Sequence, residues 1–154
     1  MCDGAAPGRG STAGPAQPTG IDTNVLVHFL TRDDPAEAAA AVAFMDGLSP
    51  AAPGFVPREV VLELVKVLER SFGYRRAQVA KALEGLLGSP GLVLEAVGRV
   101  ARALERYRHG GPDFADLMIL LAAQEAGCAV TVTFDAEAAA MPEARLLTAR
   151  PGGG

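Results

Sequence analysis

Between residue 20 and about residue 148, the sequence alternates between short apolar runs and longer segments with helical periodicity. Runs such as Gly54–Val56, Leu92–Leu94 and Cys128–Phe134 have the length and composition of buried strands. In the segments between them, apolar residues recur every three or four positions, as on one face of a helix. Short apolar strands that alternate with helices predict an α/β domain whose sheet is mainly parallel and covered by helices.

Capping residues and apolar periodicity also predict where each helix and strand lies in the sequence. Asp34 and Pro35 provide an N-cap and a first-turn proline, and Glu37 has the position of a capping-box acid. The run from Leu117 to Ala123 is apolar all round and is expected to be buried. The predicted strands cover residues 20–22, 54–56, 92–94, 128–134 and 145–148, and the predicted helices 25–30, 35–48, 57–72, 75–87 and 96–108, with a last helix from residue 113.

The two ends of the chain differ from this pattern. Residues 1–19 are rich in Gly, Pro and Ala and contain no large apolar side chain beyond Met1, so we expect a disordered leader. Residues 150–154 are expected to form a flexible tail. One domain therefore spans residues 20–149, and the overall hydrophobic content of 49% is enough for a core.

Composition excludes several classes of protein. No stretch reaches the ~20 consecutive apolar residues of a membrane span, and the N-terminus lacks a signal peptide. Cys2 and Cys128 form no C-x-x-C motif, which argues against a disulfide scaffold or a zinc site. A soluble cytoplasmic protein is the expectation. The formal net charge of −4 argues against nonspecific binding to duplex nucleic acid through a broad basic face.

Two aspartates directly follow predicted strands. Asp22 comes after Gly20 and Ile21, and Asp135 comes after Thr131–Phe134. If both strands run parallel, the two carboxylates emerge at the same edge of the sheet, where ligands of α/β proteins gather. A strand-end aspartate also commonly caps the next helix, so each of them alone has a structural explanation.

Two further acids lie in apolar surroundings. Glu63 interrupts an apolar stripe of its helix, and its structural alternative is an ion pair with Lys66. Asp116 precedes the apolar run of the last long helix, and its structural alternative is the third position of a helix capped by Asp113. Four converging carboxylates would repel one another unless cations lay between them, and oxygen ligands alone favour Mg²⁺ or Mn²⁺. Such a cluster suits the hydrolysis of phosphodiester bonds.

Four segments together resemble the ordered motifs of the PIN domain family, and more narrowly the VapC-type toxins of bacterial toxin–antitoxin pairs. They are Ile21–Val27, Leu62–Leu64, Asp113–Ile119 and Thr131–Asp135, and the resemblance extends over about residues 20–148. It implies a PIN-like three-layer α/β/α fold and a metal-dependent endoribonuclease that cleaves RNA, commonly tRNA. It also implies inhibition by a cognate VapB-like antitoxin.

Carried over by motif, the resemblance implies roles for individual residues. The acidic quartet that holds Mg²⁺ or Mn²⁺ and performs catalysis would be Asp22, Glu63, Asp116 and Asp135. The supporting residues would be Thr23, Asn24, Asp113 and Thr133.

A basic helix side and two apolar helix faces are candidate contact surfaces for RNA or for another protein chain. Arg99, Arg102, Arg106 and Arg108 form a basic side of one helix, which is either a solvated face or a contact surface for RNA phosphates. The apolar faces that contain residues 42, 44 and 45 and residues 79, 83 and 86 are larger than a small core needs. A homodimer or a docked antitoxin helix would cover them.

Three other functions stay open at this point. The acids could serve only as caps and ion-pair partners in a non-catalytic PIN-like interaction module. The chain could be a metal-dependent nuclease that cleaves DNA. A phospho-acceptor domain of the receiver type would need a strand-end lysine near the site, and no predicted strand is followed by one.

Overall fold

The computed structural model describes residues 17–149. Most of the predicted leader and the tail from residue 150 lie outside these residues, and the first strand includes Thr19. The elements are β2 (Thr19–Gly20), α2 (Thr23–Thr31), α3 (Pro35–Asp46), β3 (Gly54–Val56), α4 (Arg58–Phe72), α5 (Arg76–Leu87), β4 (Leu92–Leu94), α6 (Val97–Tyr107), α7 (Phe114–Glu125), β5 (Thr131–Thr133), α8 (Ala136–Ala139) and β6 (Ala144–Leu146).

The strands form two separate parallel sheets. The first has the order β2-β3-β4, and the second consists of β5 and β6. The predicted α/β class with short parallel strands is therefore confirmed. The strands that precede Asp22 and Asp135 belong to different sheets, so the structure does not place their ends along one sheet edge.

Local sequence signals account for most helix boundaries. Asp34 caps α3 by accepting hydrogen bonds of 3.0 Å from the backbone N–H groups of Ala36 and Glu37. Gly73 ends α4 with a φ of 67°, a left-handed conformation in which glycine is strongly favoured. The predicted helix 35–48 ends earlier, at Asp46, and the short helix α8 was not predicted.

The core lies between α2, α4, α5, α6 and α7. Its largest fully buried side chains include Leu26, Leu64, Leu83, Tyr107 and Phe114. The sequence predicted that α5 has a larger apolar face than the core needs. This prediction was wrong, because the core contains Val79, Leu83 and Leu86. Phe44 and Met45 of α3 are only half-buried, which leaves part of the other face accessible.

The helix α7 is less completely covered than its sequence predicts. Leu117 and Leu121 are buried, but the side chain of Ile119 is 57% exposed. The prediction that the whole run from Leu117 to Ala123 is buried was therefore wrong at Ile119. One side of α7 carries an apolar side chain that no other element of the described chain covers.

Arg76 holds the loop that leads into α7. Its guanidinium donates hydrogen bonds to the backbone carbonyls of Tyr107, Gly111 and Pro112 at 2.9, 2.7 and 3.1 Å. The same group lies 4.5 Å from the centroid of the Tyr107 ring, at cation–π distance. The loop contains Gly110 and Gly111 at positive φ, and these contacts hold it in place before α7 begins.

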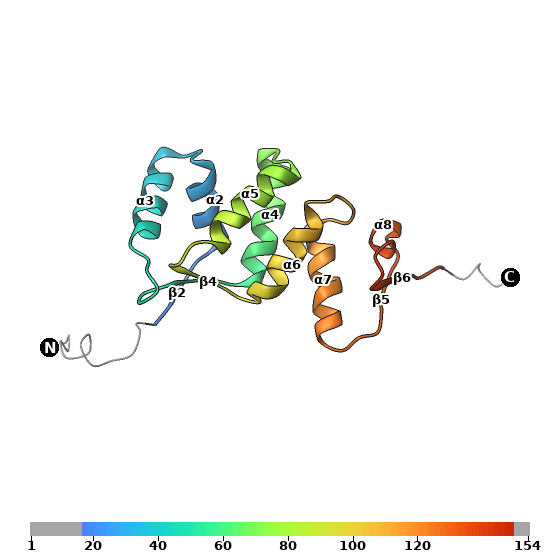
Figure 1. Ribbon diagram of the computed structural model, residues 1–154. Helices are drawn as coiled ribbons and strands as arrows, with labels where there is room; N and C mark the ends of the chain where they lie inside the picture. The colour runs from blue at the N-terminus through green and yellow to red at the C-terminus, as the bar shows by residue number, and fades with distance from the viewer. Residues whose placement is uncertain (1–16, 150–154) are drawn as a thin grey trace.

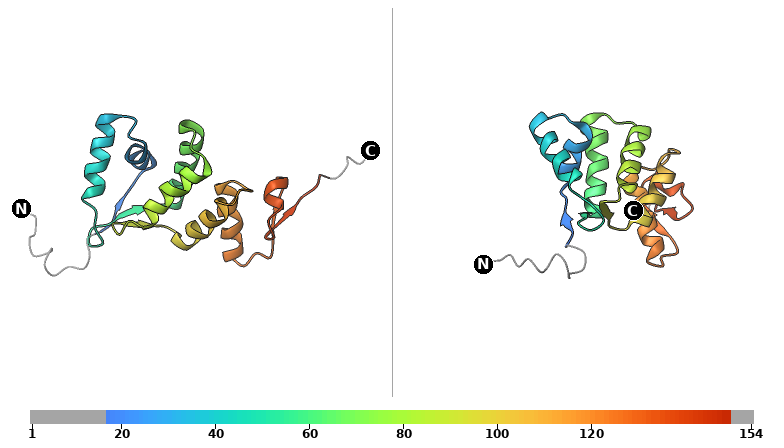
Figure 2. Two further views of the ribbon diagram at one scale, coloured as in Figure 1. Left: turned by 45° about the horizontal axis from the view of Figure 1, so that its top comes forward. Right: turned by 60° about the vertical axis from the view of Figure 1, so that its left-hand side comes forward.

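The described chain is elongated. In Figures 1 and 2, β2, α2 and α3 lie at one end, and the segment β5–α8–β6 lies at the other end beyond α6 and α7. Within residues 17–149, no helix combines the length and apolar character that crossing a bilayer requires.

Candidate active site

The first group of predicted site residues lies where β2 passes into α2. Asp22 follows the buried Ile21 with extended backbone angles and caps α2, and one of its carboxylate oxygens accepts a 2.7 Å hydrogen bond from the backbone N–H of Thr23. Its structural explanation as a helix cap is therefore correct. The carboxylate remains exposed to solvent and is available to a ligand.

Thr23 joins this position to a distant helix. The Thr23 side chain is buried, with 6% of its surface exposed, and its hydroxyl donates a 2.6 Å hydrogen bond to Oε1 of Glu63 in α4. Asp22 and Glu63 thus both accept hydrogen bonds from Thr23, one from its backbone and one from its side chain. The alternative ion pair between Glu63 and Lys66 is not formed among the residues that the structure describes.

Asn24 follows on the exposed side of α2. It lines a cavity of about 310 Å³ together with Gly20 and Ile21 at the edge of the sheet and Ala41 and Phe44 of α3. This cavity adjoins the Asp22 carboxylate along the chain. His28 and Glu37 also line it, so its walls combine polar and apolar side chains.

The second group of acids gathers at the N-terminus of α7. Asp113 caps this helix and accepts a 2.8 Å hydrogen bond from the backbone N–H of Asp116, so the predicted cap is confirmed. Burial raises the pKa of the Asp116 carboxyl above its ordinary value, and the negative charges of Asp113 and Asp135 raise it further. Asp135 therefore lies close enough to Asp116 for their charges to interact.

Asp135 is also engaged in a local turn. Its carboxylate accepts hydrogen bonds from the N–H groups of Glu137 and Ala138 at 2.8 and 3.3 Å, and its own N–H donates to Thr133 Oγ1 at 3.0 Å. Glu137 contributes to the raised pKa of Asp116, so it belongs to this acidic group although the sequence did not single it out. The sequence feature that could have identified Glu137 is its position two residues after Asp135, in the first turn of the helix that Asp135 caps.

The predicted acids thus form two groups rather than one. Asp22 and Glu63 meet at Thr23, whereas Asp113, Asp116 and Asp135 gather around the start of α7. Within residues 17–149, no three Asp, Glu, His or Cys side chains lie together as ligands for a metal ion. The donors are all carboxylate oxygens, which suits Mg²⁺ or Mn²⁺, but their spacing within one chain does not form a site. The expected convergence of the quartet is not met in the single chain.

The basic side of α6 is used within the molecule. Arg99 and Arg102 both bind Glu125 at the end of α7, and Arg108 binds Glu84 of α5. Arg106 makes two hydrogen bonds to Glu143, at 3.0 and 2.7 Å. Each of the four arginines is therefore paired with a carboxylate, although the side chains of Arg102 and Arg108 stay 53% and 37% exposed.

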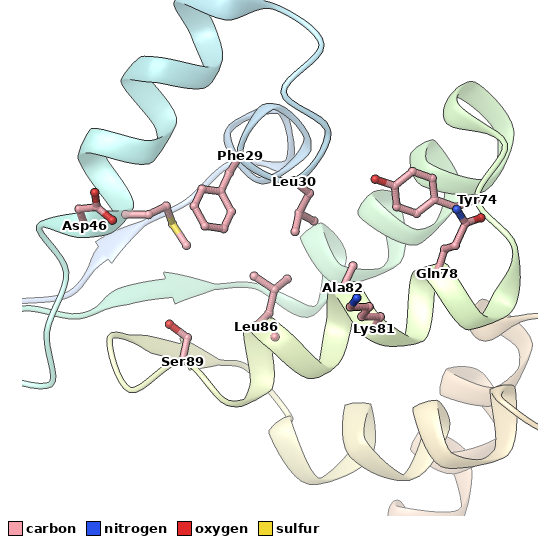
Figure 3. Close-up of a pocket in the computed structure, with 11 residues that line it drawn as sticks. Phe29, Leu30, Asp46, Tyr74, Gln78, Lys81, Ala82, Leu86 and Ser89 are labelled. Atoms are coloured by element: carbon pink, nitrogen blue, oxygen red, sulfur yellow. The ribbon is translucent and has the colours of Figure 1, made fainter.

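A larger cavity of about 710 Å³ lies between α2, α3 and α5 (Figure 3). Phe29 and Leu30 of α2 face Leu86 and Ala82 of α5 across it, and Asp46, Lys81 and Gln78 add polar groups to its lining. None of the predicted quartet lines this cavity. It is a candidate surface for a partner rather than for phosphodiester chemistry.

Comparisons with known proteins agree with the motifs. The chain is 25% identical over 114 residues to a protein of Aquifex aeolicus named VapC ribonuclease, which covers 74% of this chain and 84% of that protein. The family model of the PIN domain matches residues 21–144, a range that contains both acidic groups. The chain therefore belongs to the PIN domain family, as its sequence motifs predicted.

Proposed function

We propose that this protein is an endoribonuclease of the VapC type that acts as the toxin of a toxin–antitoxin module. The observation that carries the proposal is the meeting of Asp22 and Glu63 at Thr23, because it brings together two carboxylates from PIN motifs that lie far apart in the sequence. Membership of the PIN domain family and the similarity to a protein named VapC ribonuclease support it.

The proposed catalytic residues are the acidic quartet Asp22, Glu63, Asp116 and Asp135, with Thr23, Asn24, Asp113 and Thr133 in support. Thr23 orients Glu63, and Asp113 holds the first turn of α7 that carries Asp116. We include Mg²⁺ or Mn²⁺ as the cofactor, since hard cations offset clustered carboxylates and can activate water for phosphodiester hydrolysis. Burial is the main reason that the pKa of Asp116 is raised, and the charges of Asp113 and Asp135 add a repulsion that a cation would relieve.

The proposed partners follow from charge and from the cavity in Figure 3. Net charge is −4, and the arginines of α6 are already paired, so cations have to help offset the phosphates of an RNA substrate such as tRNA. A VapB-like antitoxin helix would fit the apolar cavity between α2, α3 and α5. The proposal also includes a homodimer and a cytoplasmic location.

The direct test is induction of the protein in a host that lacks the antitoxin. We expect growth arrest and discrete cuts in total RNA with the wild type, and neither with Asp22→Asn or Glu63→Gln. Glu105→Gln is the matched control, because Glu105 is 70% exposed on α6 and contacts only Arg108 and His109 among the described ion pairs. If Asp22→Asn cuts RNA like the wild type, Asp22 is not catalytic; if both arrest growth and neither cuts RNA, the protein is the non-catalytic interaction module.

A second test separates the possible substrates and cofactors. Purified protein is incubated with single-stranded RNA or DNA in the presence of Mg²⁺, Mn²⁺ or a chelator. We expect cleavage of RNA that the chelator abolishes. Cleavage of DNA instead of RNA would replace the proposal by the DNA nuclease.

A further inference from the structure

One exposed side of α4 carries a row of charged side chains. They recur at intervals of three or four residues, which places them on the same side of the helix, and they are Glu59, Glu63, Lys66 and Arg70. All of them are exposed, while the buried side chains of α4 face the core. This charged row is acidic in the N-terminal half of α4 and basic in the C-terminal half.

The two cations of the charged row make no ion pair with any residue that the structure describes. Glu63, three positions before Lys66, accepts a hydrogen bond from Thr23 instead. Glu69, the residue before Arg70, accepts one from the hydroxyl of a buried tyrosine of α6. The arginines of α6, in contrast, are all paired with carboxylates. Lys66 and Arg70 are thus available to an anionic ligand, in a chain whose net charge is −4.

Lys66 and Arg70 are also neighbours on the helix surface. They lie one turn apart, or ~6 Å along the axis, and like charges at this spacing repel each other. The helix macrodipole favours a cation in the last turn of α4, where Arg70 lies, but its effect fades before Lys66 in the middle of the helix. The helix alone therefore gives no reason for the pair, whereas bound anions would remove the repulsion.

The charged row runs between the two acidic groups of the candidate active site. In its N-terminal half, Glu63 meets the start of α2 at Thr23. In its C-terminal half, Glu69 contacts Tyr107, and the guanidinium that binds the Tyr107 carbonyl also binds the loop before Asp113. Figure 1 and the left view of Figure 2 show α4 between α2 and α7, and α4 contacts both helices. The cations therefore lie along the surface that leads from one acidic group toward the other.

We propose that Lys66 and Arg70 bind neighbouring phosphates of the RNA strand, so that the exposed side of α4 is the path of the substrate beside the catalytic acids. Glu63 lies in the same row, so a strand placed at Glu63 for cleavage reaches Lys66 within the next turn of the helix. Contacts of this kind position the strand and carry no information about its sequence. This inference rests on the proposed nuclease function, because it takes RNA as the ligand.

Charge distinguishes RNA from the other ligand that these cations could attract, an acidic protein segment. Such a segment would meet the carboxylates of Glu59 and Glu63 in the same row and be repelled by them. An RNA strand is drawn to those carboxylates by the divalent cations that the proposed nuclease uses. The charged row therefore favours RNA, and competition between the two ligands belongs to the test.

Binding is tested in the full-length Asp22→Asn chain, so that the RNA is not cut. A fluorescently labelled single-stranded RNA is titrated at a fixed Mg²⁺ concentration and increasing KCl, and anisotropy reports the affinity. Lys66→Ala and Arg70→Ala are each expected to weaken binding by about 2- to 5-fold. Each should also reduce the slope of log affinity against log salt by ~0.7, the value for one phosphate of a single strand. A second RNA of different sequence should lose as much.

Two variants serve as matched controls. Arg102→Ala removes the same charge from α6, where Arg102 is paired with Glu125 and 53% exposed, and it should change neither the affinity nor the slope. Lys66→Arg keeps the charge and should bind like the parent chain. If Arg102→Ala weakens binding as much as Lys66→Ala, only net charge matters and the path along α4 is wrong. A loss confined to one RNA sequence, or competition by polyglutamate as strong as by unlabelled RNA, would also overturn it.

Cleavage kinetics separate this inference from the nuclease function. In the otherwise wild-type chain, Lys66→Ala and Arg70→Ala should raise KM and leave kcat nearly unchanged, because contacts to distant phosphates are equal in the ground and transition states. A fall in kcat without a change in KM would overturn the positioning role. RNA cleavage by the wild type with unchanged affinity in both variants would reject the path and keep the nuclease. Binding that depends on both cations in a wild type that cuts no RNA would reject the nuclease function alone.

Discussion

The hydroxyl of Thr23 donates a 2.6 Å hydrogen bond to the carboxylate of Glu63, and it does so from a side chain that is almost completely buried. This contact fixes where α4 presents its acid relative to the start of α2. Asp22 accepts from the backbone of the same threonine, so one residue orients both carboxylates of the first group.

Replacing Thr23 by valine is expected to reduce RNA cleavage by about 10- to 100-fold, because residues that orient ligating or catalytic carboxylates typically contribute this much. Valine keeps the shape of the buried side chain but removes one hydrogen bond, so we expect the free energy of unfolding to fall by only about 0.5–1.5 kcal/mol. Thr23→Ser retains the hydroxyl and should keep most of the activity. Equal loss of activity in both variants would show that the hydroxyl is not what matters.

Neutralising Asp116 is expected to stabilise the metal-free fold. The pKa of Asp116 is raised by burial and then by the charges of Asp113 and Asp135, so its ionised form costs stability at pH values above its ordinary pKa of 3.8. Asp116→Asn should therefore melt at a higher temperature than the wild type at pH 7 in a chelator, and the difference should shrink as the pH falls toward 3.8. A lower melting temperature at pH 7 would contradict this.

The Arg106–Glu143 pair predicts a pH dependence of opposite sign. Hydrogen bonds from Arg106 lower the pKa of Glu143 below its ordinary value of 4.5, so the pair stabilises the fold above that pH and is lost as the pH falls below the lowered pKa. Glu143→Gln should reduce the free energy of unfolding by about 1–2 kcal/mol at pH 7. Urea titrations at pH 7 and at the acid end of the stable range measure both values. The exposed Glu105→Gln control should change neither.

Removing the guanidinium of Arg76 is expected to destabilise the protein strongly. Arg76→Ala loses three hydrogen bonds to backbone carbonyls and the contact with the Tyr107 ring, for which we expect about 2–4 kcal/mol by chemical denaturation. Arg76→Lys should recover only a minor part, because an ammonium group lacks the planar fork of donors. Arg70→Ala on the exposed end of α4 is the control and should stay within about 0.5 kcal/mol of the wild type.

Two glycines are expected to respond in opposite directions to alanine. A Cβ at Gly91 would lie 2.9 Å from Cβ of Leu48 and 3.0 Å from its carbonyl carbon, so Gly91→Ala has to displace backbone and should cost about 1–3 kcal/mol. Gly85 lies inside α5 with open space around it, and Gly85→Ala should stabilise the fold by about 0.5–1 kcal/mol. Urea unfolding of both variants checks the two signs. Stabilisation by Gly91→Ala would show that β4 does not approach Leu48 this closely.

Local sequence was sufficient for most of the secondary structure and for the identity of the family. The cap and proline before α3 act within one turn of the helix, and the apolar periods of α4 and α5 reflect which face each helix buries. Such signals depend only on residues that are close together in the sequence, so they can be recognised without knowledge of the tertiary structure. The same holds for Asp113, whose capping of α7 was predicted and is confirmed.

Tertiary structure decided what the distant side chains do. Whether Glu63 pairs with Lys66 or accepts from Thr23 depends on how α2 packs on α4, and the arginines of α6 are paired because α7 and the loop before β6 present Glu125 and Glu143 to them. The division of the acids into two groups follows from sheet order, since β2 and β5 end in different sheets. Periodicity along a chain specifies which face of a strand is apolar but not which strand lies beside it, because backbone hydrogen bonds pair any two compatible edges.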